Sequence, residues 1–107
     1  MLEVDYEPEA FPGAKVRLRP LTAALDWQYN VALGANRFTD IQRAFAEVVI
    51  ECEGAPYFGP GKGTCEKYSR TEVPQLDPDF VFDVVTHAHE LAHLTEEELG
   101  NSRAPST

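Results

Sequence analysis

Little in this 107-residue sequence indicates secretion or a membrane. Only two cysteines occur, Cys52 and Cys65, too few for the disulfide framework of a small secreted protein. We therefore expect two reduced thiols, with a single disulfide as the alternative. No apolar run approaches the ~20 residues of a membrane-spanning helix, and the acidic first ten residues lack the apolar core of a signal peptide. These absences predict a cytoplasmic protein.

Basic residues are also scarce. Nine Lys and Arg stand against 18 Asp and Glu, which gives a net charge of -9. Nucleic-acid binding needs clustered positive charge, and so does docking on an anionic membrane, so both partners are predicted to be absent. Residues 71–100 contain eight acidic residues and no Lys or Arg. This stretch favours a basic protein partner or self-association, or it is simply a solvated helix surface.

The remaining composition is that of an ordinary globular protein, with 43% hydrophobic and 25% charged residues. We predict one domain over residues 1–100 and a disordered tail over 101–107. The predicted fold class is mainly α (α+β). An N-terminal β-strand or hairpin packs on about three to four helices, and a long Gly/Pro-rich loop covers residues 54–76. The hairpin is expected from alternating residues near 2–6 and 16–19, separated by a turn.

Apolar spacing and capping residues place the helices. Thr22 is a predicted N-cap for a helix over residues 23–33. Apolar residues at three- and four-residue spacing predict the clearest helix, from Phe38 to Cys52, with Gly54 as its stop. Cys52 lies on that apolar stripe and is interpreted as a small buried residue.

The last long helix is predicted to have Asp77 as its N-cap and Pro78 as its first helical residue. The segment Thr95–Glu98 has the pattern of a new helix start, which predicts a break near Leu94. The residues predicted to form the core are Phe38, Ile41, Phe45, Val48, Val81, Val84 and Ala88.

The sharpest motif is H-E-x-x-H, formed by His89, Glu90 and His93. On a helix this spacing lets both imidazoles bind one zinc ion, and the glutamate acts as the base of a hydrolase. A third protein ligand is not evident. Glu97 would lie about 12 Å along the axis from His89 if the helix ran on, and His87 points to a different side. We therefore predict no metal, cofactor or catalytic residue. The alternative is a small zinc-dependent hydrolase with His89 and His93 as ligands and Glu90 as base.

Two other motifs are incomplete. In the stretch Gly59–Thr64, Gly63 separates Lys62 from the hydroxyl residue that a phosphate-binding loop requires directly after the lysine. Cys52 and Cys65 could complete a Cys₂His₂ set with the two histidines, but they are too far apart for a zinc-finger knuckle.

Two stretches together resemble the small tail assembly chaperones of long-tailed bacteriophages. One is VRLRPLTA at residues 16–23, a strand running into the first helix. The other is LAHLTEEELGNS at residues 91–102, a late helix running into an acidic segment. Together they cover about 20 of the 107 residues.

The resemblance implies a mainly helical protein of the host cytoplasm that coats an apolar, helical tape-measure protein and recruits tail-tube subunits. It carries over no catalytic residues. The compact ending departs from family members that gain a second module by frameshifting, which leaves open another virion or prophage accessory protein. A third hypothesis is an acidic inhibitor that mimics nucleic acid. On physical grounds the candidate partner-binding residues are Tyr57, Phe58, Glu96, Glu97 and Glu98.

Overall fold

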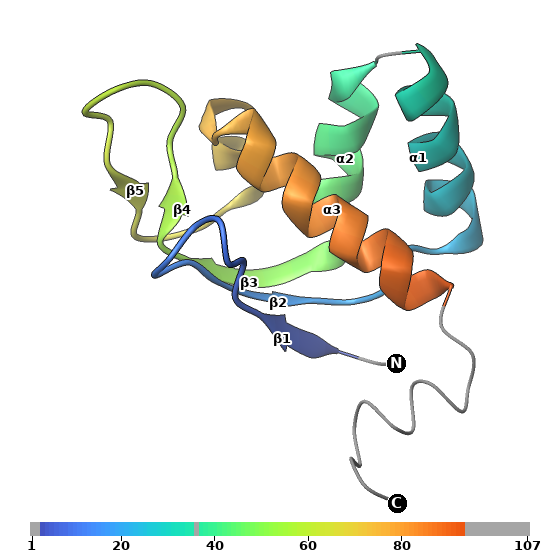
Figure 1. Cartoon of the computed structure of the whole chain (residues 1–107), viewed down its shortest axis with the longest axis horizontal. Helices are drawn as coiled ribbons and strands as arrows, with labels where there is room; N and C mark the ends of the chain where they lie inside the picture. Colours follow the sequence, from blue (N-terminus) through green and yellow to red (C-terminus); the bar gives the residue numbers. More distant parts are fainter. Residues whose placement is uncertain (1–2, 36, 94–107) are drawn as a thin grey trace, which may run out of the picture.

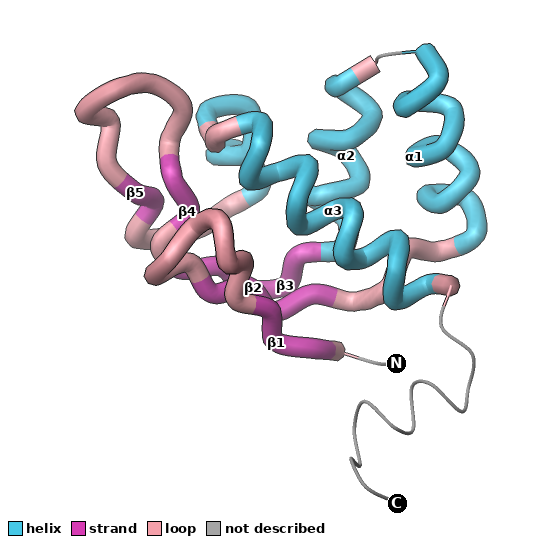
Figure 2. Tube along the Cα trace, in the orientation of Figure 1, coloured by secondary structure: helices cyan, strands magenta, loops and turns pink. Residues whose placement is uncertain are grey.

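The computed structural model describes residues 3–35 and 37–93. A small antiparallel sheet forms one layer and the helices cover one of its faces (Figures 1 and 2). This α+β arrangement confirms the coarse fold class. The strands are β1 (Val4–Tyr6), β2 (Lys15–Leu18), β3 (Val49–Glu53), β4 (Ala55–Pro56) and β5 (Thr64–Cys65). The helices are α1 (Ala23–Ala35), α2 (Phe38–Val48), the 3₁₀ helix η1 (Arg70–Gln75) and α3 (Pro78–Ala92).

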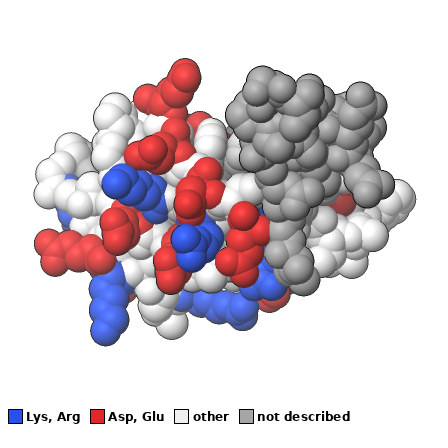
Figure 3. Space-filling view, turned by 90° about the horizontal axis from the view of Figure 1, so that it is seen from below, with Lys and Arg blue, Asp and Glu red and all other residues white. Residues whose placement is uncertain are grey.

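The three-stranded sheet has the order β1-β2-β3, with β2 in the centre. The predicted hairpin is confirmed, because β1 and β2 pair antiparallel with Val4 opposite Leu18. Val16 and Leu18 are buried beneath the helices, whereas Lys15 and Arg17 are exposed. The face of the sheet away from the helices carries acidic and basic side chains side by side (Figure 3).

The predicted helix from Phe38 to Cys52 is wrong in its second part. Helix α2 ends at Val48, and β3 begins at the next residue and pairs with β2. The apolar stripe predicted too long a helix because Val49 and Cys52, which continue the helical spacing, are buried in the strand instead. β-branched residues at 49 and 50 favour extended backbone, and β2 offers a partner strand that supplies the ladder hydrogen bonds.

The predicted caps of the other helices are confirmed. The amide N of Leu25 donates to Oγ1 of Thr22 over 3.3 Å, and that of Asp79 donates to Oδ1 of Asp77 over 2.8 Å. Helix α1 runs two residues beyond the predicted end at 33. Helix α3 ends at Ala92, with His93 as its C-cap.

The Gly/Pro-rich stretch 54–76 contains regular structure and is not one continuous loop. Strands β4 and β5 form a hairpin, and η1 follows it. Gly54 begins this region with φ +68°, and a Cβ there would lie 2.6 Å from the carbonyl oxygen of Gly13. Only glycine fits this close approach without a shift of backbone.

The core lies between the sheet and the helices. Six of the seven predicted core residues are buried, and Phe38 is only partly buried. The largest fully buried side chains of the core include Phe45, Phe80, Leu18 and Leu76. The expected break at Leu94, the carboxylates Glu96–Glu98 and the tail 101–107 lie outside the described residues.

Candidate functional site

Helices α1 and α3 bring one carboxylate and two imidazoles together. Oδ1 of Asp26 on α1 lies 2.6 Å from Nδ1 of His89 and 3.0 Å from Nε2 of His93. The second carboxylate oxygen lies 3.0 Å from the same nitrogen of His93. The candidate ligand atoms of the three residues all lie within 4.8 Å of one another. We call this group the Asp–His–His cluster.

The two helices hold the cluster from both sides. His89 and His93 are four residues apart, so they lie one above the other on the same side of α3. The ring of Tyr29, one turn after Asp26 on α1, stacks on His89 with centroids 4.6 Å apart. The Tyr29 hydroxyl is hydrogen-bonded to Oγ1 of Thr86 over 3.1 Å. These contacts fix the separation of α1 and α3 at the cluster.

The electrostatics of Asp26 follow from this geometry. Partial burial alone would raise the pKa of its carboxyl, but the hydrogen bonds from His89 and His93 outweigh burial and hold the pKa below its ordinary value. The ionised carboxylate is therefore the favoured form in the fold. Asp26 is the one charged residue of α1, and its side chain is 19% exposed.

The remaining motif residue, Glu90, lies on a different side of α3. Its carboxylate is 3.9 Å from Nδ1 of His87. His87 in turn stacks on Tyr6, with ring centroids 3.9 Å apart, and the Tyr6 hydroxyl donates to Asp83. Glu90, His87, Tyr6 and Asp83 line one hollow together. The structure thus joins the two motif histidines to an unpredicted partner, Asp26, and sets the motif glutamate apart from them.

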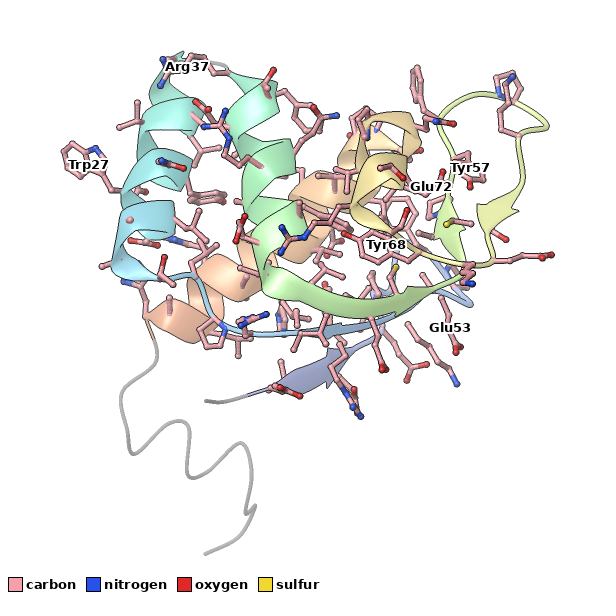
Figure 4. All side chains as sticks on the ribbon, turned by 180° about the vertical axis from the view of Figure 1, so that it is seen from behind. Trp27, Arg37, Glu53, Tyr57, Tyr68 and Glu72 are labelled. Carbon is pink, nitrogen blue, oxygen red and sulfur yellow. The ribbon has the colours of Figure 1, made fainter. Side chains whose placement is uncertain are left out.

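Two of the predicted partner-binding residues lie at the start of the β4–β5 hairpin loop. The Tyr57 hydroxyl donates to Glu72 of η1 over 3.1 Å, so this side chain is tied to the body of the protein (Figure 4). Phe58 is 66% exposed. The other three, Glu96–Glu98, fall outside the described residues.

A further surface, which the sequence reasoning missed, lies on α1. At 100° per residue, six of its residues fall within about 120° of the helix circumference, away from Tyr29 and Ala32, which are buried. Trp27 stands at the centre of this strip, is 71% exposed and points away from the protein (Figure 4). The strip contains no charged residue. We call it the α1 outer face, and it comprises Ala23, Ala24, Trp27, Val31, Gly34 and Ala35.

Both cysteines are buried and unpaired. Desolvation, followed by the neighbouring Cys65, raises the pKa of the Cys52 thiol to about 12, so this group is held as an unreactive thiol. The Asp–His–His cluster includes neither cysteine, and the Cys₂His₂ grouping is therefore not formed among the described residues.

Comparisons with protein-family models, with curated proteins and with solved structures each gave no match to this chain. Among the residues described, no helix combines the length and apolar character needed to cross a membrane. The fold is that of a small α+β protein with a sheet covered on one face by helices.

Proposed function

We propose that the chain is a non-enzymatic assembly or interaction protein that binds a helical segment of a partner protein. The tail assembly chaperones that its sequence resembles act in this way, so the proposed partner is a phage tape-measure protein or tail subunit met in the host cytoplasm. The observation that carries the proposal is the α1 outer face, which is apolar and uncharged and, apart from the half-buried Val31, exposed.

A strip of this composition stands out on a chain with a net charge of -9. Single exposed apolar residues are normal on soluble proteins, but contiguous apolar patches mark binding sites. Trp27 gives the strip an anchor, since tryptophan is enriched among the residues that dominate binding energy. The residues around it are mostly Ala and Gly, which let a second helix approach closely.

A helical partner fits this surface best. Helix-in-groove and helix-on-helix recognition use apolar anchors at three- and four-residue spacing. The α1 outer face presents Ala23, Trp27 and Val31 at four-residue spacing. The phage context rests on the sequence resemblance, and the binding surface rests on the exposure of α1.

The alternatives have less support. The zinc hydrolase gains a third ligand in Asp26, but Glu90 faces His87 and not the cluster. The acidic inhibitor requires a surface of carboxylates, whereas the open face of the sheet intersperses them with Lys15 and Arg17 (Figure 3).

Because Trp27 is the single tryptophan, its fluorescence tests the proposal directly. A peptide copying an apolar helical stretch of a tape-measure protein should shift the emission to shorter wavelength as the indole is buried. In calorimetry, Trp27→Glu should weaken binding by at least ~2 kcal/mol, about 30-fold in Kd. Phe58→Glu is the matched control, because Phe58 is an equally exposed aromatic on the hairpin.

The two variants separate the possible results. Loss of binding in Phe58→Glu alone would move the partner site to the β4–β5 hairpin. Failure of wild-type protein to bind any such peptide would overturn the chaperone role. A concentration-dependent emission shift without peptide would identify a second copy of the chain as the occupant of α1.

A further inference from the structure

We infer that Asp26, His89 and His93 form a binding site for a divalent transition-metal ion, with zinc the expected metal. The inference stands on the geometry of the Asp–His–His cluster and is independent of the proposed partner. It assigns a role to both histidines of the H-E-x-x-H motif and to the one charged residue of α1.

The donor set suits zinc. Zinc in proteins is held by imidazole nitrogens at about 2.0–2.1 Å and carboxylate oxygens at about 2.0–2.2 Å, in tetrahedral geometry. Those bond lengths place neighbouring donor atoms roughly 3.3–3.5 Å apart. The carboxylate of Asp26 lies 2.6 and 3.0 Å from the two histidine nitrogens. These two separations are 0.3–0.9 Å shorter than the roughly 3.3–3.5 Å between donors on one zinc ion, so the side chains must move apart by that much to admit the ion.

The same donor set excludes the hard cations. Magnesium and calcium prefer six or more oxygen ligands, and the cluster offers one carboxylate and two imidazoles. Imidazole with carboxylate suits zinc, copper, nickel and iron. Zinc is the choice that needs no redox chemistry and accepts a three-residue site with an open fourth position.

The site is partly preformed and open to solvent. Asp26 and His89 are on helices, His93 is the C-cap of α3, and the ring of Tyr29 stacks on His89. Fixing ligands before binding reduces the entropy lost when the ion arrives. The side chain of His93 is 57% exposed, so an ion can enter and a water molecule can occupy the remaining position.

The geometry assigns the metal a joining role between helices and not a hydrolytic one. A hydrolase needs a base beside the metal-bound water, and Glu90, the motif's base, lies on the His87 side of α3. An ion bound to residues of α1 and α3 would link the two helices, which are far apart in sequence, and stabilise the fold wherever it binds the native state alone.

The test uses the untagged full chain, purified without chelator and without added metal. Elemental mass spectrometry and calorimetric titration with zinc chloride should give one zinc ion per chain and a raised Tm. His89→Ala, His93→Ala and Asp26→Ala should each weaken zinc binding by roughly tenfold or more, because each removes one of three ligands. His87→Ala is the matched control, since it removes a histidine of the same helix from outside the cluster, and it should retain zinc.

Circular dichroism checks that each variant is folded, and Asp26→Asn provides a second variant of nearly unchanged shape. Absence of zinc binding by the wild-type chain overturns the inference. Unchanged zinc affinity in both Asp26 variants would show that Asp26 is not a ligand, and it would overturn the inference as well. Displacement of the zinc by millimolar magnesium would show that an acidic surface attracts cations in general. That result would also overturn the inference.

Discussion

Helices α1 and α2 lie next to each other and are of similar length, yet they differ in which kinds of side chain they bury and which they expose. Helix α2 buries Ile41, Phe45 and Val48 and exposes polar side chains such as Arg43 and Glu47. Helix α1 buries only Tyr29 and Ala32, and most of its exposed positions, such as Trp27 and Leu33, are apolar. Apolar residues of this fold are therefore of two kinds. Those of α2 are packed inside the domain, and most of those on the outside of α1 are exposed.

The difference in burial between α1 and α2 follows from the arrangement of the helices. Helix α2 packs against both α1 and α3, whereas α1 lies at the edge of the helical layer (Figure 1). A helix with apolar residues on both its inner and its outer side is normally surrounded. Among the described residues, α1 is covered on its inner side alone, and its single carboxylate accepts hydrogen bonds from His89 and His93.

The largest effect is expected on the inner side of α2. Phe45→Ala should lower the free energy of unfolding by about 3–5 kcal/mol, because Phe45 is fully buried and its removal leaves a cavity. Urea unfolding followed by circular dichroism measures it. Phe38→Ala is the control from the same helix and should cost distinctly less, since Phe38 is only partly buried. A loss below ~1 kcal/mol for Phe45→Ala would contradict the burial of this face.

The inner face of α2 could be predicted from the sequence, because an apolar residue every three or four positions is a local signal. The end of α2 could not. Val48, Val49 and Cys52 are apolar whether the chain continues as a helix or turns into a strand, and β2, which decides between them, lies more than thirty residues earlier. The hairpin within 54–76 was missed for a related reason. Its strands have two residues each, too short to show any period.

An intermediate effect is expected where α1 meets α3. Asp26→Asn should lower stability by about 1 kcal/mol at pH 7, because it removes a carboxylate that accepts hydrogen bonds from two histidines. The folded-state pKa of Asp26 is depressed, so its contribution is present above the ordinary aspartate pKa of about 3.9 and is lost as pH falls below that value. The difference between wild type and variant should therefore shrink in acid.

Unfolding curves at several pH values between neutral and acid measure this difference, in chelator-treated protein so that metal plays no part. Asp5→Asn is the control. Asp5 belongs to an exposed ion pair with Arg17, and exposed pairs contribute little. A stability difference for Asp26→Asn that persists unchanged into acid would show that the asparagine disturbs packing and that the carboxylate charge is not the cause.

The candidate site was half visible in the sequence. The histidine pair at four-residue spacing could be recognised because both residues lie on one helix. Asp26 lies 63 residues before His89, and its place beside the pair depends on how α1 packs against α3, which no local pattern encodes. One signal was present: Asp26 is the one charged residue of an otherwise uncharged helix. The position of Glu90 follows from helix geometry, since neighbouring residues differ by about 100° around the axis.

The smallest effect on stability is expected on the outside of α1. Trp27→Ala should change the free energy of unfolding by no more than about 0.5 kcal/mol, because the indole is 71% exposed. Alanine has a higher helix propensity than tryptophan, so the expected change in the free energy of unfolding runs from zero to a slight increase. Urea unfolding followed by circular dichroism measures it without the tryptophan. A loss as large as that of Phe45→Ala would place the indole in the core of the domain and remove the α1 outer face as a binding surface. A neutral result, together with impaired binding by Trp27→Glu, would establish the contrast between the two helices: α2 contributes its aromatic residue to folding, and α1 contributes its own to recognition.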